Sequence, residues 1–284
     1  MKWANVVVNR DVRAGLVQGD MICLSQASDV KHILSDLEGA AAQAESGACI
    51  PLETAQLRQP ILRPGKILGI GLNYAAHAKE SVSFVKSTPT SVQKWFNKQT
   101  TAANGPFDPI HLPVVSEQLD YEAELVAIIG KTGRHVPEAR AHELIAGYCC
   151  GCDVSVRDWQ RASQTMIMGK GFDTHAPFGP YLVTPDEIND FGALEVRGYV
   201  NGELRQSGHA RDMVFSLAEQ IAHLTHAFTL EPGDVIFTGT PAGVGAGFDP
   251  PKWMKAGDRV RVEISSLGHI ENEIVREPNE TVLE

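Results

Sequence analysis

Short alternations of apolar and polar residues dominate the chain and predict many strands and few helices. Several segments combine β-branched or alternating apolar residues with flanking glycine, proline or aspartate, which is typical of strands. These segments are YEAELVAIIG, GYCCGCDVSV, ALEVRGYVNG, DVIFTGTP and DRVRVEIS. We therefore expect a mixed α+β fold that is rich in strands.

Helical periodicity is clearest between residues 211 and 228, where apolar side chains recur three or four residues apart. The sequence EPGD at residues 231–234 would end this helix. The apolar stripe is expected to face the core or a subunit interface. It consists of Met213, Leu217, Ile221, Leu224 and Phe228.

The N-terminal part of the chain combines short β segments with one expected helix at about residues 29–45, which is typical of a small α+β domain. Prolines interrupt the segment LRQPILRPGK, so we place a domain boundary there. Residues 1–62 then form a small N-terminal domain, and residues 63–284 form the larger one. The polar segment 82–107 is long for a connector and predicts a mobile loop over a site.

The composition is that of an ordinary globular protein. The chain has 284 residues, 43% of them hydrophobic, which is enough to bury a sizeable core. Its formal net charge of -10 would repel phosphate backbones and anionic lipids, which argues against nucleic-acid and membrane partners. The sequence contains no apolar leader region and no apolar stretch of about 18 residues. We therefore expect a cytoplasmic protein.

Three of the five cysteines lie together, at Cys149, Cys150 and Cys152. This spacing does not form the framework of a disulfide-stapled secreted domain, which favours a reducing compartment. A thiolate metal site is the alternative, but neighbouring strand residues point to opposite faces and cannot close a tetrahedron together. Buried packing is the preferred interpretation of these thiols.

Two carboxylates recur at strand spacing in the segment DYEAELVAII. A strand there would place Glu122 and Glu124 on one face, followed by Val126 and Ile128. Desolvated carboxylates held this close repel each other and either take up a proton or bind a cation. A solvated strand end is the alternative, and the pattern alone leaves it open.

A third carboxylate, Asp153, ends the segment GYCCGCD, and alternation places it on the same face as Gly151 and Cys149. The small neighbours would leave room for an ion. Three hard oxygen ligands with open positions suit Mg²⁺ or Mn²⁺ better than Zn²⁺.

Further polar clusters could act on a substrate. His77 and Glu80 lie three residues apart on an expected helical turn, where the carboxylate can orient the imidazole as a general base. In isolation, a surface ion pair is the preferred interpretation of these two residues. Lys170 lies in an expected flexible loop between two glycines. This lysine and the glycine-rich loop around Thr240 could both bind a carboxylate or an enolate.

The glycine loops do not match nucleotide-binding motifs. The segment GKT at residues 130–132 has Leu125 where a P-loop needs its first glycine, and the segment GIG at residues 69–71 is followed by Tyr74 where a dinucleotide fingerprint needs glycine. Nucleotide binding is therefore disfavoured.

Six segments, in this order and across most of residues 65–275, resemble the fumarylacetoacetate hydrolase family. They are GIGLNYAAHAKE, DYEAELVAIIGK, GYCCGCDVSVRDWQ, KGFDTHAPFGPYLV, VNGELRQSG and PGDVIFTGTPAGVG. The resemblance implies a β-roll C-terminal domain, a homodimer, and a Mg²⁺ or Mn²⁺ ion held by Glu122, Glu124 and Asp153. The CCGC run departs from the residues usual in the family behind the metal.

The same resemblance implies roles for the other clusters. His77 and Glu80 match a water-activating pair, which weakens the surface-pair interpretation. The catalytic set is then His77, Glu80 and Lys170. The substrate contacts expected in addition to Lys170 are Asn73, Tyr74, Gln160 and Thr240.

The expected activity is hydrolysis of a C–C bond in a 2,4-diketo acid, an acylpyruvate or a 2,4-diketo-3-deoxy sugar acid, to pyruvate and a carboxylic acid. Such a reaction would belong to carbohydrate or aromatic catabolism. The alternatives are decarboxylation of oxaloacetate, isomerisation of a 2-hydroxyhepta-2,4-diene-1,7-dioate and dehydration of a 2-keto-3-deoxy acid, because the fold does not fix the reaction. A non-catalytic protein that binds small keto acids is a further alternative.

Overall fold

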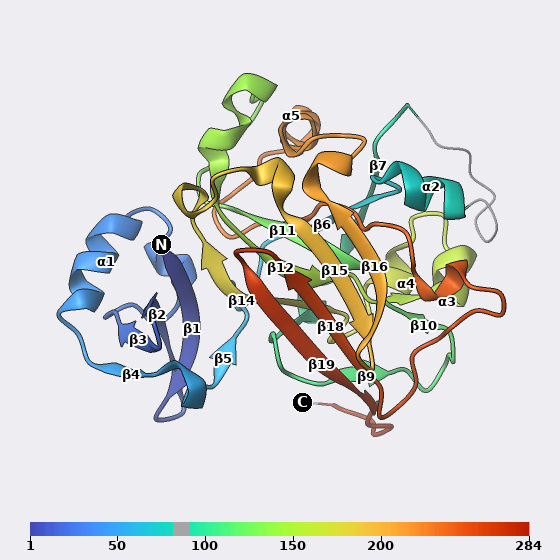
Figure 1. The fold of residues 1–284 in the computed structure, drawn as a ribbon, viewed down its shortest axis with the longest axis horizontal. Coiled ribbons are helices and arrows are strands. Elements are labelled where there is room, and N and C mark those ends of the chain that lie inside the picture. Colours follow the sequence, from blue (N-terminus) through green and yellow to red (C-terminus); the bar gives the residue numbers. More distant parts are fainter. Residues whose placement is uncertain (82–90, 284) are drawn as a thin grey trace.

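The structure, a computed structural model, describes residues 1–81 and 91–283 (Figure 1). It confirms the expected mixed, β-rich fold. A long sheet runs in the order β4-β3-β2-β1-β14-β12-β11-β17-β6-β7, with β5 beside β1 and β8 beside β14. Its strands are β1 (Lys2–Val8), β2 (Asp11–Gln18), β3 (Met21–Leu24), β4 (Cys49–Pro51), β5 (Leu57–Arg58), β6 (Ile67–Gly71), β7 (Lys94–Lys98), β8 (Ala103–Asn104), β11 (Ala123–Ile129), β12 (Ile145–Cys152), β14 (Ala176–Val183) and β17 (Val235–Phe237).

Two smaller sheets and short helices complete the fold. The five-stranded sheet contains β16 (Glu203–His209), β15 (Glu195–Val200), β18 (Arg259–Ile264), β19 (Gly268–Arg276) and β9 (Ile110–Leu112), and the third sheet pairs β10 (Leu119–Asp120) with β13 (Ser155–Val156). The α-helices are α1 (Leu37–Glu45), α2 (Ala75–Ser81), α3 (Arg157–Ala162), α4 (Ile167–Lys170) and α5 (Leu217–Ala227). The 3₁₀ helices are Val30–Ile33, Leu52–Thr54, Thr100–Ala102, Glu138–Leu144, Pro185–Glu187, Phe191–Ala193, Ala210–Asp212 and Gly245–Gly247.

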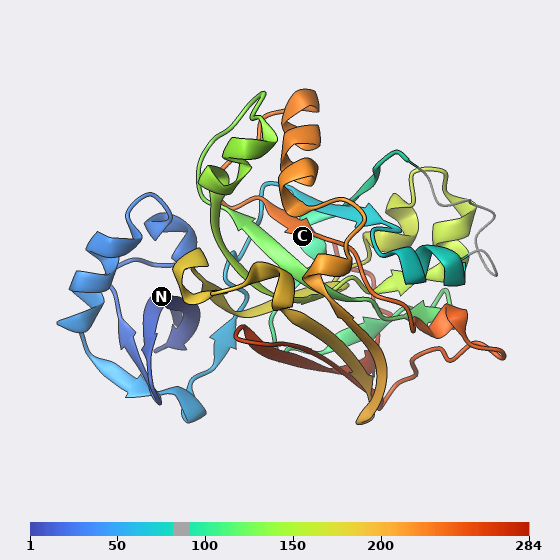
Figure 2. The same cartoon turned by 45° about the horizontal axis from the view of Figure 1, so that its top comes forward.

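The main core lies between the long sheet and the five-stranded sheet. Leu125 and Ile129 on β11 point into it, whereas Val126 and Ile128 pack on the opposite face of the long sheet. The expected alternation along this strand is therefore confirmed. The strand is buried on both faces, and Figure 2 shows α5 standing beside the 3₁₀ helix Glu138–Leu144 at one edge of this core.

The N-terminal strands continue the long sheet. β1 pairs antiparallel with β14, with Lys2 opposite Val183 and Trp3 opposite Leu182. In Figure 1 the N-terminal elements lie at one end of the molecule, and α2, α3 and α4 gather at the other end. The two-domain division near residue 62 stays a prediction, and the sheet runs through both of its parts.

Both predicted helices differ from the observed elements at their starts. The helix expected at residues 29–45 is divided, because the Asp36 side chain accepts a hydrogen bond from the Gly39 N–H and caps a separate helix α1. The helix expected from residue 211 begins only at Leu217, where Ser216 and Glu219 form a reciprocal capping box. Local side-chain caps thus override the apolar periodicity.

The prediction of a mobile loop over residues 82–107 is wrong for the second half of this segment. Lys94–Lys98 forms β7, which pairs antiparallel with β6 at the edge of the long sheet. Its polar composition hides the strand because Lys98 is buried against a carboxylate rather than exposed. Residues 82–90 lie outside the described residues.

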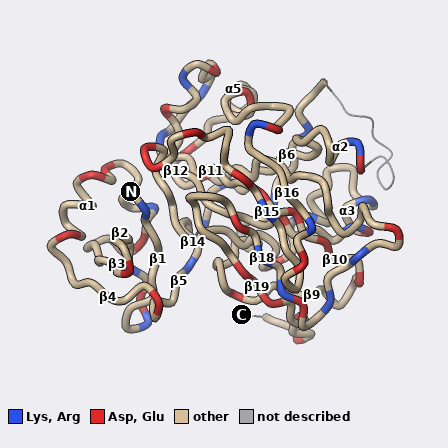
Figure 3. The backbone as a smooth tube through the Cα atoms, in the orientation of Figure 1, with Lys and Arg blue, Asp and Glu red and all other residues tan. Residues whose placement is uncertain are grey.

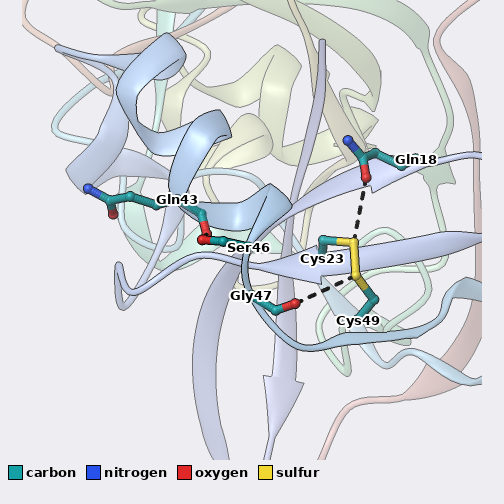
Figure 4. The surroundings of a disulfide bond; sticks show 6 residues. All are labelled: Gln18, Cys23, Gln43, Ser46, Gly47 and Cys49. Carbon is teal, nitrogen blue, oxygen red and sulfur yellow. Dashed lines mark hydrogen bonds between the residues drawn. A yellow bond between two sulfur atoms is a disulfide. The ribbon is translucent and has the colours of Figure 1, made fainter.

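Cys23 on β3 and Cys49 on β4 form a disulfide, and their Cα atoms lie 4.0 Å apart (Figure 4). The chain therefore contains a disulfide, although its cysteine spacing favours a reducing compartment. The two residues lie 26 positions apart in sequence and become neighbours only through the β3–β4 register. Cys149, Cys150 and Cys152 are free and buried, as expected.

Loss of this disulfide should destabilise the fold. Closing a loop of this length is worth about 3 kcal/mol through the entropy of the unfolded chain. We expect Cys49→Ser, or reduction of the native protein, to lower the free energy of unfolding in urea by about that amount. Reduction should change nothing further in Cys49→Ser. Five titratable thiols in denatured protein prepared without reductant would contradict the bond.

Charged groups of both signs are spread over the chain (Figure 3). Among residues 1–81 and 91–283, none of the helices has the length and apolarity needed to span a bilayer.

Candidate active site

The three carboxylates converge where the start of β11 lies beside the end of β12. These strands pair antiparallel with Ala123 opposite Cys152, and the Asp153 N–H donates to the Glu122 carbonyl oxygen at 2.9 Å. One oxygen each from Glu122, Glu124 and Asp153 lies within 4.8 Å of the others, and all three side chains are buried. The alternative of a solvated strand end is therefore wrong.

The glycine opposite Glu124 serves packing. A Cβ added to Gly151 would lie 2.4 Å from Val126 and 2.8 Å from Phe237. The expectation that this small residue leaves room for an ion is wrong, because neighbouring apolar side chains fill the space.

Buried cations surround the carboxylates. The Lys170 ammonium lies 2.7 Å from Glu122 Oε2 and 2.5 Å from Asp153 Oδ2. The Lys98 ammonium lies 2.5 Å from Asp153 Oδ1 and donates to the Val154 carbonyl oxygen. Lys170 is 1% exposed at the end of α4. The expectation of a flexible loop there is wrong, because two ion pairs hold this lysine in place.

Arg157 and Asp120 join this network, and sequence reasoning assigned a role to neither. An Arg157 nitrogen lies 2.7 Å from Glu122 Oε1, and its Nε donates to Asp120 Oδ2 at 2.8 Å. The Asp120 carboxylate also accepts the N–H groups of Gly245 and Ala246. One feature of the sequence could have indicated a role for Arg157. It lies three residues before Gln160, an expected substrate contact, in the segment RDWQ.

The pKa values of Glu122 and Glu124 shift in opposite directions. Burial, together with the charges of Asp153 and Glu122, raises the pKa of Glu124 well above its usual value. Burial also opposes ionisation of Glu122, but Lys170 and Arg157 hold the pKa of that carboxyl below its usual range. Three buried carboxylates whose mutual repulsion is only partly relieved form a hard-oxygen donor set that fits Mg²⁺ or Mn²⁺.

His77 and Glu80 lie on α2, and the structure brings them together as expected. His77 Nδ1 is 3.1 Å from Glu80 Oε2. His77 is 5% exposed, so the surface ion pair is the wrong interpretation. The Gly243 N–H donates to Glu80 Oε1 at 3.0 Å, which fixes the carboxylate from the other side.

The glycine loop around Thr240 binds the protein's own carboxylates. The N–H of Gly239 donates to Glu124 Oε2 at 2.8 Å, and the N–H of Gly243 donates to Glu80. The expectation that these N–H groups grip a substrate carboxylate is wrong, because each already has a carboxylate partner. The loop instead ties the acidic cluster to the His77–Glu80 pair.

Gly243 is required by the geometry of this loop. Its φ is +108°, and an added Cβ would lie 1.8 Å from the Arg205 carbonyl oxygen. We expect Gly243→Ala to displace the loop, to release Glu80 and to lower the turnover of the metal-loaded protein by about 100-fold. Metal binding, measured by calorimetry, should persist.

Gly202→Ala is the matched control for this prediction. Gly202 also has a positive φ, +78°, but no atom of the described part of the chain lies within 4 Å of its added Cβ. Equal turnover in the two alanine variants would show that the loop does not position Glu80.

His77 and two members of the acidic cluster, Glu122 and Glu124, line one cavity of about 240 Å³, whereas Asp153 does not line it. Of the residues expected from the sequence, it brings together His77, Glu122, Glu124, Gln160, Lys170 and Thr240. The other lining residues are Ile70, Gly71, Leu72, Ser81, Lys94, Phe96, Arg157, Gln164 and Met166.

Asn73 and Tyr74 do not line this cavity. The Asn73 amide donates to the Phe215 and Thr238 carbonyl oxygens and accepts the Phe215 N–H, so its polar atoms are engaged in joining three segments. Tyr74 is 2% exposed, and burial raises the pKa of its hydroxyl. Both residues are therefore buried outside the cavity and not exposed to a ligand in it.

Comparison with known proteins gives a family match over most of the chain. A family model described as fumarylacetoacetate (FAA) hydrolase C-terminal matches residues 66–275. The mitochondrial oxaloacetate tautomerase FAHD2A of Homo sapiens is 41% identical over 228 residues, which are 80% of this chain and 71% of that protein.

Solved structures share the whole fold. The fumarylacetoacetate hydrolase of Exiguobacterium antarcticum has a TM-score of 0.86 and 33% identity, covering 98% of this chain and 100% of that chain. The maleylpyruvate hydrolase of Sphingobium sp. SYK-6, solved in complex with manganese(II) and pyruvate, has a TM-score of 0.80 and 33% identity with the same coverage.

Proposed function

Because the chain belongs to the fumarylacetoacetate hydrolase family, we propose that it is a Mg²⁺- or Mn²⁺-dependent hydrolase that cleaves a C–C bond in a 2,4-diketo acid. The products would be pyruvate and a carboxylic acid. The observation that carries this proposal is that His77, which contacts Glu80, lines the same cavity as Glu122 and Glu124. Asp153 completes the cluster of three carboxylates beside these two glutamates.

Glu122, Glu124 and Asp153 would hold the cation. When bound, a divalent ion would supply Lewis acidity that polarises the 2-oxo group of the substrate. Lys98 would support Asp153 and not contact the substrate, because it does not line the cavity. It donates to Asp153 Oδ1, whereas Lys170 donates to Oδ2.

His77 would act on water. Its Nδ1 faces Glu80, so Nε2 is the nitrogen available to accept a proton. The resulting hydroxide adds to the C4 carbonyl carbon, and the C3–C4 bond breaks. The proton then moves from His77 to C3 of the three-carbon fragment, which leaves as pyruvate beside the new carboxylic acid.

Lys170 and Gln160 would stabilise the three-carbon fragment. The Lys170 ammonium lies over the Phe96 ring, 4.7 Å from its centroid, and borders the cavity beside Glu122. It can balance the negative charge that develops on the substrate oxygens as the C3–C4 bond breaks. The Gln160 amide, whose oxygen accepts a hydrogen bond from Arg157, would bond the same fragment.

A product analysis tests this proposal. Chelator-treated protein should be supplied with Mg²⁺ or Mn²⁺ and then with acylpyruvates, a 2,4-diketo-3-deoxy sugar acid or oxaloacetate. We expect metal-dependent release of pyruvate and an equimolar carboxylic acid. Release of CO₂ alone, or absence of pyruvate with every diketo acid, would overturn the proposed hydrolysis.

Tautomerisation of oxaloacetate is the second candidate. The 41% identity with a mitochondrial oxaloacetate tautomerase over 80% of the chain favours it. His77 would then move a proton between the enol oxygen and C3, with no water added. Metal-dependent loss of enol absorbance from oxaloacetate, without pyruvate from any diketo acid, would establish this reaction instead.

We also propose a cytoplasmic homodimer. The family resemblance supports the dimer, and the formal net charge of -10 argues against a membrane surface as the location. Light scattering of the purified protein would test the dimer.

A further inference from the structure

Strand β7 contributes one face to the candidate active site. Lys94, Phe96 and Lys98 share that face, because side chains alternate along a strand. Lys98 reaches Asp153, and Phe96 lies beneath the Lys170 ammonium. Lys94 lines the cavity farther along the strand, its Cα roughly 13 Å from that of Lys98 at ~3.3 Å per residue.

Lys94 differs from the other lysines of the site in its partners. Lys98 and Lys170 are buried in ion pairs with the acidic cluster. Lys94 is only half-buried, and its side chain makes no hydrogen bond or ion pair with any residue in ranges 1–81 and 91–283. Its positive charge is therefore available to a ligand.

The surroundings of Lys94 leave space for such a ligand. Its partner across the β6–β7 ladder is Gly71, which also lines the cavity. Among the residues that the structure describes, a Cβ added to Gly71 would have a single neighbour within 4 Å, the Lys94 carbonyl oxygen at 3.8 Å. No side chain from β6 therefore covers this position.

The cavity wall is apolar at Ile70, Leu72 and Met166. A ligand that fits this lining has one anionic end beside the acidic cluster, where Lys170 and Arg157 supply positive charge. Its middle is apolar, and a second anionic group lies near Lys94. A neutral end would leave the Lys94 ammonium without a partner in a partly desolvated site, which is unfavourable.

We propose that Lys94 is a specificity-determining residue that binds a second carboxylate of the substrate, so that the preferred substrates are dicarboxylic 2-oxo acids. The identity of the first bound group as a 2-oxo acid rests on the proposed function. Recognition of the far carboxylate rests on Lys94 and the cavity.

Binding of non-reacting ligands tests this proposal without turnover. The probes are 2-oxoglutarate and 2-oxohexanoate. The first ends in a carboxylate, and the second has an ethyl group in its place. Each is titrated by calorimetry into Mg²⁺-loaded protein. The native protein should bind 2-oxoglutarate about tenfold more tightly, as expected for a partly buried ion pair. Lys94→Met should bind both probes equally, and Lys94→Arg should keep the preference.

Lys79→Met is the matched control, because Lys79 is exposed on α2 and does not line the cavity. This variant loses the same charge and should keep the preference. Equal binding of the probes by the native protein, an unchanged preference in Lys94→Met, or no binding of either probe would overturn the inference. A Lys94-dependent preference in a protein that hydrolyses no diketo acid would overturn only the proposed reaction.

Discussion

Replacement of His77 by asparagine is expected to lower the kcat of the metal-loaded enzyme by about 10³-fold, the usual contribution of a general base. The asparagine amide can take the place of Nδ1 toward Glu80, so the carboxylate keeps its partner while the proton-accepting Nε2 is removed. Affinity for Mg²⁺ or Mn²⁺ should change little, because His77 is not part of the carboxylate cluster.

His223→Asn is the control for this experiment, since His223 is exposed on α5. Its turnover should equal that of the native enzyme. The division of roles between base and metal ligands would be wrong if His77→Asn kept full turnover, or if it lost metal affinity together with activity.

Neutralising the two glutamates should change the stability of the metal-free protein in opposite directions. Glu122→Gln leaves Lys170 and Arg157 facing a neutral amide, and breaking such buried pairs costs about 3 to 5 kcal/mol. Glu124→Gln should stabilise the metal-free protein at pH 7, because the amide resembles the protonated acid and cannot ionise on unfolding.

The pH dependence follows from the directions of the two pKa shifts. The folded pKa of Glu122 is depressed, so its contribution is present above its unfolded pKa and is lost as the pH falls. The folded pKa of Glu124 is raised, so native stability is lost as the pH rises from the unfolded pKa toward the folded one. The advantage of Glu124→Gln should therefore grow as the pH rises above the unfolded pKa of a glutamate.

Both variants should bind Mg²⁺ or Mn²⁺ more than about 100-fold more weakly, because even residues that only support a ligand change affinity by 10- to 100-fold. Urea unfolding of chelator-treated proteins and metal titration by calorimetry measure the two effects. Equal losses of stability in the two variants would contradict the charge assignment, and retained metal affinity would contradict the role of these carboxylates.

The acidic cluster could be predicted because its geometry is mostly local. Strand alternation alone places Glu122 and Glu124 on one side, and the antiparallel pairing of β11 with β12 brings Asp153 to the same end. The His77–Glu80 contact is also local, since it spans a single turn of α2.

The cations around the cluster could not be predicted in the same way. Lys98 reaches Asp153 only because β7 joins the long sheet beside β6, and a lysine in a polar segment gives no sign of burial. Asp120 binds Arg157 and the backbone near Gly245 across long sequence separations.

The N-terminal part shows the same limit. The Cys23–Cys49 bond depends on the β3–β4 register, and the pairing of β1 with β14 joins residues more than 170 positions apart, as for Lys2 and Val183. Local patterns predict the strands but do not specify which strands become neighbours.

The central claim is that the acidic cluster holds a divalent cation beside a 2-oxo acid. Anomalous diffraction from crystals grown with Mn²⁺ and oxalate would test it most directly, because oxalate resembles the enolate form of pyruvate. The account predicts one manganese peak per chain among Glu122, Glu124 and Asp153, with oxalate in the cavity within reach of Lys170. A peak elsewhere, or an acidic cluster that remains bound only to Lys98, Lys170 and Arg157, would contradict it.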